Sequence, residues 1–169
     1  MSLSIHDLTV PVLTRGLGVL SAYLDKAEAD ATARNFKPPA ILDARLYPDM
    51  LSFTSQVQRV SDTAKASVAR LTGVEAPAFP DTETSFVELK ERIAKTLAFI
   101  ASVPAAAFEG AAERSIEMRY GKASLTLSGR DYVTKFMLPN FYFHLVTAHA
   151  ILRHNGVAVG KMDFLGSFD

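Results

Sequence analysis

The sequence contains no cysteine, and it has no excess of charge of either sign. Without cysteine the chain has no disulfide, no thiolate nucleophile and no cysteine-ligated zinc or iron–sulfur centre, so a metal would need His, Asp, Glu, Asn or Gln ligands. Its 18 lysines and arginines balance 18 aspartates and glutamates. No long-range field therefore favours a polyanion, and we expect neither nucleic acid nor a membrane among its partners.

Long apolar runs and nucleotide-binding loops are also missing. No apolar stretch approaches the roughly 20 residues that span a bilayer, and residues 1–13 lack a basic start followed by an apolar run, so we expect a cytoplasmic location. There is no G-x-S-x-G motif and no glycine-rich phosphate or dinucleotide loop. The 169 residues are about half apolar, which is enough for one well-filled core, and we expect a single domain over residues 1–169.

Apolar residues recur at three- and four-residue steps in four segments, which predicts an all-α fold. The first helix is expected over Thr9–Arg34 with its N-cap at the first residue, which places Pro11 in the first turn. A start at Ser4 would instead put the proline inside the helix. Gly16 and Gly18 indicate either close approach of another helix or a tolerated cost, and we favour the second.

The next two helices are marked by turn and capping residues. The second is expected to begin at residues 47–50 (Tyr-Pro-Asp-Met) and to end at Thr72, with Gly73 as C-cap. The third runs from a capping box at residues 85–88 to about Val103. We expect Arg45 and Asp49 to form an ion pair and cap where the second helix starts, and they are secondary candidates for a functional site.

Residues 114–128 alternate between apolar and polar side chains around Gly121-Lys122, which predicts a β-hairpin. Two strands alone are marginally stable, so the hairpin should pack on the helices or pair with another chain. The last helix is expected over Arg130–His154, kinked by Pro139 and ended by Asn155-Gly156. Up-down-up-down packing of the four helices is the economical arrangement.

The last helix carries more aromatic surface than one buried stripe can hold. Either it is central in the bundle, or part of this surface contacts a partner, and we expect a homodimer formed through it or through the hairpin. The residues are Phe136, Phe141, Tyr142 and Phe143. Phe164 and Phe168 in the tail are expected to dock on the bundle or on a partner.

The histidines of the last helix cannot jointly bind one ion. His144, His149 and His154 follow at steps of five, and each step rotates the side chain by about 140°. Asn140 and His144 do share a face, at a spacing of four. His144 is either a satisfied boundary histidine or part of a functional polar site; we interpret His149 as a boundary residue and His154 as a cation at the helix C-terminus.

On the second helix, Arg59 and Asp62 lie roughly 140° and 160° from the apolar stripe by helical rotation. A solvated role is the simpler interpretation for both. Asp62 is kept as a secondary site candidate.

Four segments together resemble the family called domain of unknown function 1993, within the DinB/YfiT-like helical bundles. They are residues 45–50, 79–84, 139–144 and 151–156. The resemblance implies a DinB-like four-helix bundle. It also implies, for the wider superfamily, a metal held by three histidines that sometimes serves thiol transfer or hydrolysis. His144 matches the last of these ligands, whereas Asn140 and Arg59 stand at the positions of the other two.

One imidazole of three remains, and a guanidinium would repel a divalent ion, so we expect no cofactor, although zinc or nickel is what the resemblance implies. Arg59, Asn140 and His144 then predict a site for a small polar or anionic ligand, with Arg59 pairing an anion, Asn140 orienting it and His144 exchanging a proton. Enzymatic activity stays open. The alternatives are a non-catalytic dimeric interaction module and a metal-dependent transferase or hydrolase.

Overall fold

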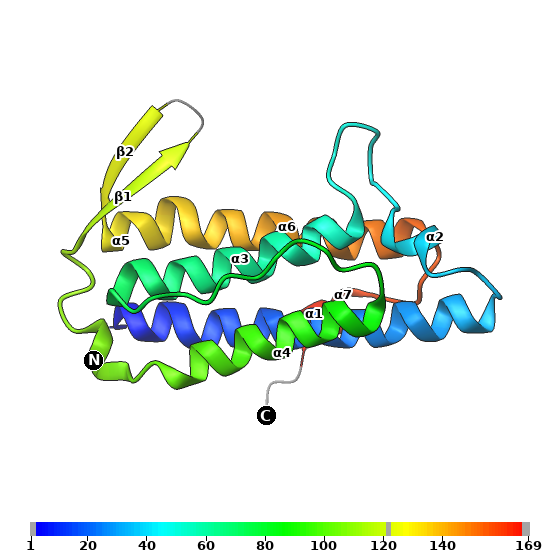
Figure 1. Cartoon of the computed structure of the whole chain (residues 1–169), viewed down its shortest axis with the longest axis horizontal. Helices are drawn as coiled ribbons and strands as arrows, with labels where there is room; N and C mark the ends of the chain where they lie inside the picture. The colour runs from blue at the N-terminus through cyan, green and yellow to red at the C-terminus, as the bar shows by residue number, and fades with distance from the viewer. Residues whose placement is uncertain (1–2, 121–122, 167–169) are drawn as a thin grey trace.

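The structure is a computed structural model that describes residues 3–120 and 123–166. Its four long helices form a bundle, shown in Figure 1: α1 (Ile5–Ala33), α3 (Phe53–Thr72), α4 (Phe86–Ser102) and α6 (Leu138–His154). The shorter elements are α2 (Pro39–Leu42), the 3₁₀ turn η1 (Ala105–Phe108), the strands β1 (Ser115–Tyr120) and β2 (Ala123–Ser128), α5 (Gly129–Tyr132), the π-helical turn η2 (Val133–Met137) and α7 (Lys161–Leu165). The prediction of a helical bundle with a hairpin before the last helix is confirmed. The predicted turn Gly121-Lys122 lies outside the described residues.

The direction of α4 differs from the expected up-down-up-down order. Helix α6 runs antiparallel to α3, because His144 meets Gln56 and Asn140 meets Thr63. The loop after α3 runs back along this helix, from Lys65, which bonds to Pro77, to Gln58, which bonds to Glu83, so α4 begins beside the first half of α3. Helices α3 and α4 are therefore parallel, and the order is up-down-down-up (Figure 1). The connection over residues 73–85 returns along α3. A dozen extended residues reach about 40 Å, which exceeds the about 30 Å length of a 20-residue helix.

The core lies between the four long helices. Its largest fully buried side chains come from all four of them and from α2 and α5: Tyr23, Tyr132, Phe53, Phe141, Leu13, Leu17, Leu20, Leu24, Ile41, Leu71, Leu89 and Ile93. Burying each such side chain contributes about 1.5–3 kcal/mol relative to exposure. Within the described residues, no helix has the length and apolar character that crossing a membrane requires.

Two helices begin at other residues than predicted. Helix α1 begins after Ser4, whose hydroxyl accepts a hydrogen bond from Asp7 N while the Asp7 carboxylate accepts one from Ser4 N. This capping box outweighs the cost of Pro11 inside the helix. Helix α3 begins after Ser52, which caps Ser55 N, because the chain around residues 47–50 is irregular. The predicted end at Gly73 is confirmed, with φ at +80°.

The segment before Pro139 is a π-helical turn. In η2 the amide N–H of Leu138 donates to Val133 O, five residues earlier, and Pro139 then lies in the first turn of α6. Proline is tolerated there because the first turn leaves its amide positions unpaired. The kink was predicted at Pro139, but the departure from α-helical hydrogen bonding lies in the turn before it, at Val133–Met137.

The hairpin stands at one end of the bundle, beside the start of α6 (Figure 1). Ile116 and Met118 of β1 are buried, whereas Glu117 and Arg119 are exposed. Their cross-strand neighbours on the apolar face are Leu127 and Leu125, the second of which is 47% exposed. One face of the hairpin therefore packs on the bundle, as predicted, and leaves part of that apolar face open.

Candidate functional site

Asn140 and His144 lie one turn apart on α6, and both face α3. Asn140 Nδ2 donates to Thr63 Oγ1 at 2.8 Å, and His144 Nδ1 lies 2.8 Å from Gln56 Oε1. Helix α3 thus holds both predicted site residues by side-chain contacts, in the position expected for a polar site between these two helices.

The hydrogen bonds of Gln56 determine the form of the His144 ring. Gln56 Nε2 donates to Leu51 O at 3.2 Å, so the amide oxygen is the atom that meets His144. An amide oxygen only accepts, and Nδ1 therefore carries the proton while Nε2 of the neutral ring keeps its lone pair. Burial and, second, the positive charge of Arg59 hold the pKa of His144 below its ordinary value of 6.5.

This lowered pKa predicts a measurable titration. The folded state binds the proton less tightly than the unfolded chain, so the contribution of His144 to stability is present above pH 6.5 and is lost as the pH falls toward the folded-state pKa. NMR titration of the ring should give a midpoint below 6.5, which Arg59→Gln should raise and the control Arg70→Gln should leave unchanged. A midpoint at or above 6.5 in the unaltered protein would contradict the assignment.

Arg59 is engaged with the loop that returns along α3. Its Nη2 donates to Asp81 Oδ2 at 2.7 Å, and its Nη1 lies 3.8 Å from Asp62 Oδ2. Asp62 also pairs with Arg92 and Lys65, at 2.7 and 3.2 Å. The predicted angle from the apolar stripe is right, and the side chains of Arg59 and Asp62 keep 42% and 31% exposure, but a loop covers part of this face, which the sequence did not predict.

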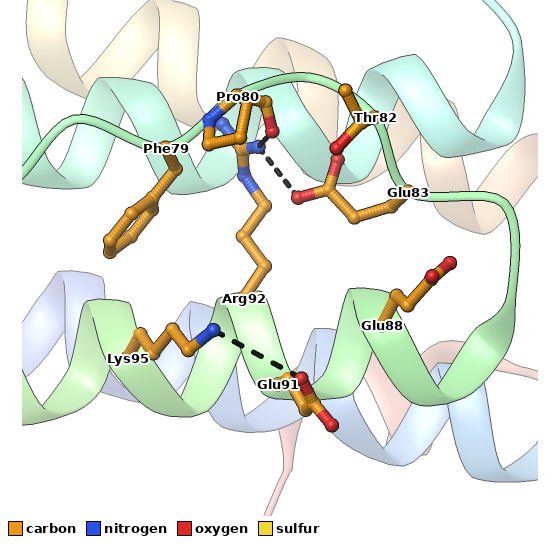
Figure 2. A pocket seen from close by; sticks show the side chains of 8 residues that line it. All are labelled: Phe79, Pro80, Thr82, Glu83, Glu88, Glu91, Arg92 and Lys95. Atoms are coloured by element: carbon orange, nitrogen blue, oxygen red, sulfur yellow. Dashed lines mark hydrogen bonds and ion pairs between the residues drawn. The ribbon is translucent and has the colours of Figure 1, made fainter.

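Arg92 is the centre of this contact, and it was not among the predicted site residues. Only 2% of its side chain is exposed, and it pairs with Asp62, Asp81 and Glu83 at 2.7, 3.0 and 2.8 Å. It also donates to Ser61 Oγ and to Pro80 O, and Figure 2 shows it extending from α4 to the loop. Burial alone would lower the pKa of Arg92, but the bond to Glu83 and the charges of the three carboxylates raise it.

Lys65 and Gln58 complete the attachment of the loop. Lys65 donates to Pro77 O at 3.1 Å and lies 3.9 Å from the centre of the Phe79 ring, and Gln58 donates to Glu83 at 2.8 Å. Burial opposes ionisation of Glu83, but the bonds from Arg92 and Gln58 hold the pKa of Glu83 below its ordinary value. Three cations meet three carboxylates here, so the attachment carries no net charge.

Arg45 and Asp49 do not form the predicted ion pair. Arg45 Nη1 donates to Met50 O, and Asp49 is exposed with no hydrogen bond or ion pair to any described residue. The arginine closes the irregular turn before α3. Ser52, rather than Asp49, caps the helix.

The remaining histidines lie away from Asn140. His149 is half-buried, its Nδ1 lies 2.6 Å from Tyr23 Oη, and burial is the main cause of its lowered pKa. His154 is exposed in the last turn of α6, as predicted, and His6 stacks edge-on against Phe108. Phe164 of α7 packs edge-on against His149, while Phe168 lies outside the described residues.

The side chains around His144 do not fit a divalent metal. They offer one imidazole and two amides, Asn140 and Gln56, with the Arg59 guanidinium near enough to lower the pKa of the imidazole. Amides are weak ligands, and the cation opposes a second positive charge. In the described part of the chain, no cluster of three or more His, Cys, Asp or Glu side chains has metal-binding geometry.

A groove opens beside Asn140, between the hairpin and the start of α6. Its volume is about 610 Å³, and it is mostly apolar. The lining residues are Met118, Ser124, Leu125, Lys135, Phe136, Pro139, Asn140 and Phe143. Asn140 is the predicted site residue that this groove includes; Arg59 and His144 are not in its lining.

The sequence profile of the family described as Domain of unknown function (DUF1993) matches residues 5–165. The chain belongs to this family. It is similar to a solved structure described as a DinB family member protein from Shewanella denitrificans, with 41% identity and a TM-score of 0.91, covering 96% of this chain and 92% of that one. Curated proteins give no match. The predicted membership in the DUF1993 family and the DinB-like fold are confirmed.

In this DUF1993 chain, one of the four family-like segments has a structural explanation. Residues 79–84 form the part of the returning loop that Arg92, Arg59 and Gln58 bind. The sequence did contain one indication that α4 binds this loop, which is the place of Arg92 on the buried face of the helix. The other buried residues of α4 are Phe86, Leu89, Ile93, Thr96 and Ile100. A charge at such a position needs a partner.

Proposed function

We propose that this protein binds a small, mainly apolar molecule that carries a hydrogen-bond donor, in the groove between the hairpin and α6, and that it does so without a metal. The observation that carries the proposal is the groove itself. Its volume of about 610 Å³ exceeds the volume of about 340 Å³ of the cavity between α2 and α3, and it has a residue of the predicted site in its wall.

The size and the lining of the groove support a small-molecule ligand. Its volume of about 610 Å³ lies within the range of about 300–1,000 Å³ that is typical of such sites, and apolar walls with few polar groups are usual for them. Leu125 and Phe143 are 47% and 57% exposed, so a ligand that covers them removes apolar surface from water.

The polar end of the groove supports a ligand that donates a hydrogen bond. Asn140 uses its amide N–H on Thr63, and its carbonyl oxygen accepts no bond from any described residue. One turn further along α6, Nε2 of neutral His144 is a second acceptor. An amide, hydroxyl or amine in the groove would complement the Asn140 oxygen, whereas only a ligand that extends beyond the groove lining would meet His144. Arg59 already pairs with Asp81, and its charge lowers the pKa of His144. Because this cation is engaged, an anionic ligand is less favoured than the sequence predicted.

Binding is favoured over catalysis because the described residues that line the groove include no imidazole and no carboxylate. Lys135, the charged residue among these described lining residues, pairs with Asp131 at 2.8 Å. His144, the one proposed proton acceptor, does not line the groove.

N-phenyl-1-naphthylamine is a suitable probe, because it has an apolar body, one N–H donor and fluorescence that rises in apolar surroundings. We expect saturable binding that dialysis against EDTA leaves unchanged. Phe143→Ala should weaken binding at least about tenfold by removing apolar contact, and Asn140→Leu should weaken it about fivefold by removing one acceptor.

The control is Met162→Ala, which removes a 65% exposed apolar side chain outside the groove and should leave the affinity unchanged. Equal loss of probe binding in all three variants, or none in any, would count against the groove. Binding that disappears with EDTA would favour the metal-dependent alternative.

A second candidate, a non-catalytic interaction module, is supported by exposed apolar residues that continue along α6 from the groove. Tyr142, Phe143 and Val146 are 40%, 57% and 48% exposed. A protein partner would cover all three residues. A ligand in the groove would contact Phe143 but not Tyr142 or Val146, which do not line the groove. Val146→Glu therefore separates the two candidates, because it should spare probe binding and weaken only a protein contact.

A further inference from the structure

The hairpin presents two unpaired edges. It is a two-stranded sheet, and among the described residues no backbone hydrogen bond joins β1 or β2 to a third segment. Strand edges of this kind are templates for pairing with another chain, and natural proteins often block them with charged side chains, especially lysine, or with proline. The described residues of both strands contain no proline.

The charges on β1 are opposite in sign and two residues apart. Glu117 and Arg119 are both exposed on the solvent face, and Met118 lies between them on the buried face. In an antiparallel pair of two β1 strands centred on Met118, Glu117 of each copy lies opposite Arg119 of the other. Opposite charges directly across a strand pair are favourable, and like charges there are unfavourable.

The other edge lacks this complementarity. The solvent face of β2 carries Ser124 and Thr126, which are uncharged, so pairing two copies of β2 gains no charge pair. The charge pattern therefore selects the β1 edge and selects a second copy of the same chain.

We propose that the protein forms a two-fold homodimer in which the β1 strands of two copies pair antiparallel about Met118 and make one four-stranded sheet. The interface is isologous, so each Glu117–Arg119 contact occurs twice. Two further strands also relieve the marginal stability of an isolated hairpin. The same operation places the apolar faces of both hairpins on one side of the sheet, because residues opposite each other in a strand pair point to the same face.

Sedimentation velocity of untagged protein over a concentration series tests the dimer. Either Glu117→Arg or Arg119→Glu replaces two attractive contacts by two repulsive ones, and each should weaken dimerisation at least about tenfold. The double variant, with both charges exchanged, regenerates the complementary pattern and should restore it. Glu113→Arg and Arg130→Glu are matched controls, since they change the net charge equally at exposed positions outside the two strands and should not dissociate the dimer.

If the double variant dimerises again, the β1 interface is supported. A folding defect in the single variants would not be repaired by a second charge reversal. The proposal is overturned by a protein that stays monomeric at the highest concentration, by a dimer that both single reversals leave intact, or by a double variant that stays dissociated. A dimer that resists the reversals but dissociates on Phe143→Glu would place the interface on α6 instead.

Discussion

Replacing Arg92 by leucine is expected to lower the free energy of unfolding by about 3 kcal/mol. The substitution leaves Glu83, which is 10% exposed, without its cation, and Asp62 and Asp81 lose the partner that they share. Removing one member of a buried ion pair typically costs 3–5 kcal/mol, and the lower end applies because both aspartates keep some access to water. Urea denaturation followed by circular dichroism measures the change.

Lys95→Ala is the matched control, because Lys95 lies on the same helix and makes only an exposed contact of 4.0 Å with Glu91. It should change the stability by less than about 0.5 kcal/mol. Arg92→Lys should be intermediate, since an ammonium keeps the charge but not the planar fork that reaches three carboxylates. If Arg92→Leu is as stable as the control, the buried ion pairs do not hold the loop.

The pH dependence of the same contact has a defined sign. Because the pKa of Glu83 is lowered, its contribution to stability is present above the ordinary value of 4.5 and is lost as the pH falls through the folded-state pKa. The Arg92→Leu variant removes the main partner of Glu83 and should therefore lose less stability on acidification than the unaltered protein does.

The existence of the four helices and the hairpin could be predicted because their determinants are local. Periodicity, the capping box at residues 85–88 and Gly73 all act within a few residues. The direction of α4 could not be predicted in this way, because an amphipathic stripe is the same for a helix running up or down. Only the length of the connection over residues 73–85 carried information, and a long connection permits both directions.

The candidate site was predicted in part for the same reason. Asn140 and His144 lie on one face of α6 because four residues make about one turn, and this spacing is visible in the sequence. The role of Arg59 and Asp62 depends on residues 79–84, which are distant in the sequence and contact α3 only through the folded loop. Rotation angles place a side chain on a face, but they do not say what covers that face.

The two glycines of α1 should respond to alanine in opposite directions. A Cβ atom at Gly16 would lie 2.4 Å from Cε1 of the buried Phe141 ring, so α6 approaches α1 closely here and our expectation of a merely tolerated glycine is wrong at this position. A Cβ atom at Gly18 would meet nothing within 4 Å. Overpacking a core usually costs about 1–3 kcal/mol, whereas alanine at an open helix position gains up to about 1 kcal/mol over glycine.

Gly16→Ala is therefore expected to lower the free energy of unfolding by about 1–2 kcal/mol, and Gly18→Ala to raise it by about 0.5–1 kcal/mol. Because both variants add one methyl group to the same helix, helix propensity cancels in the comparison, and the difference of about 2 kcal/mol reports the contact with Phe141. Combining Gly16→Ala with Phe141→Leu provides the decisive measurement. The smaller side chain should accept the methyl group, so the double variant should be more stable than the sum of the single effects predicts. Additive effects would mean that the two side chains do not meet.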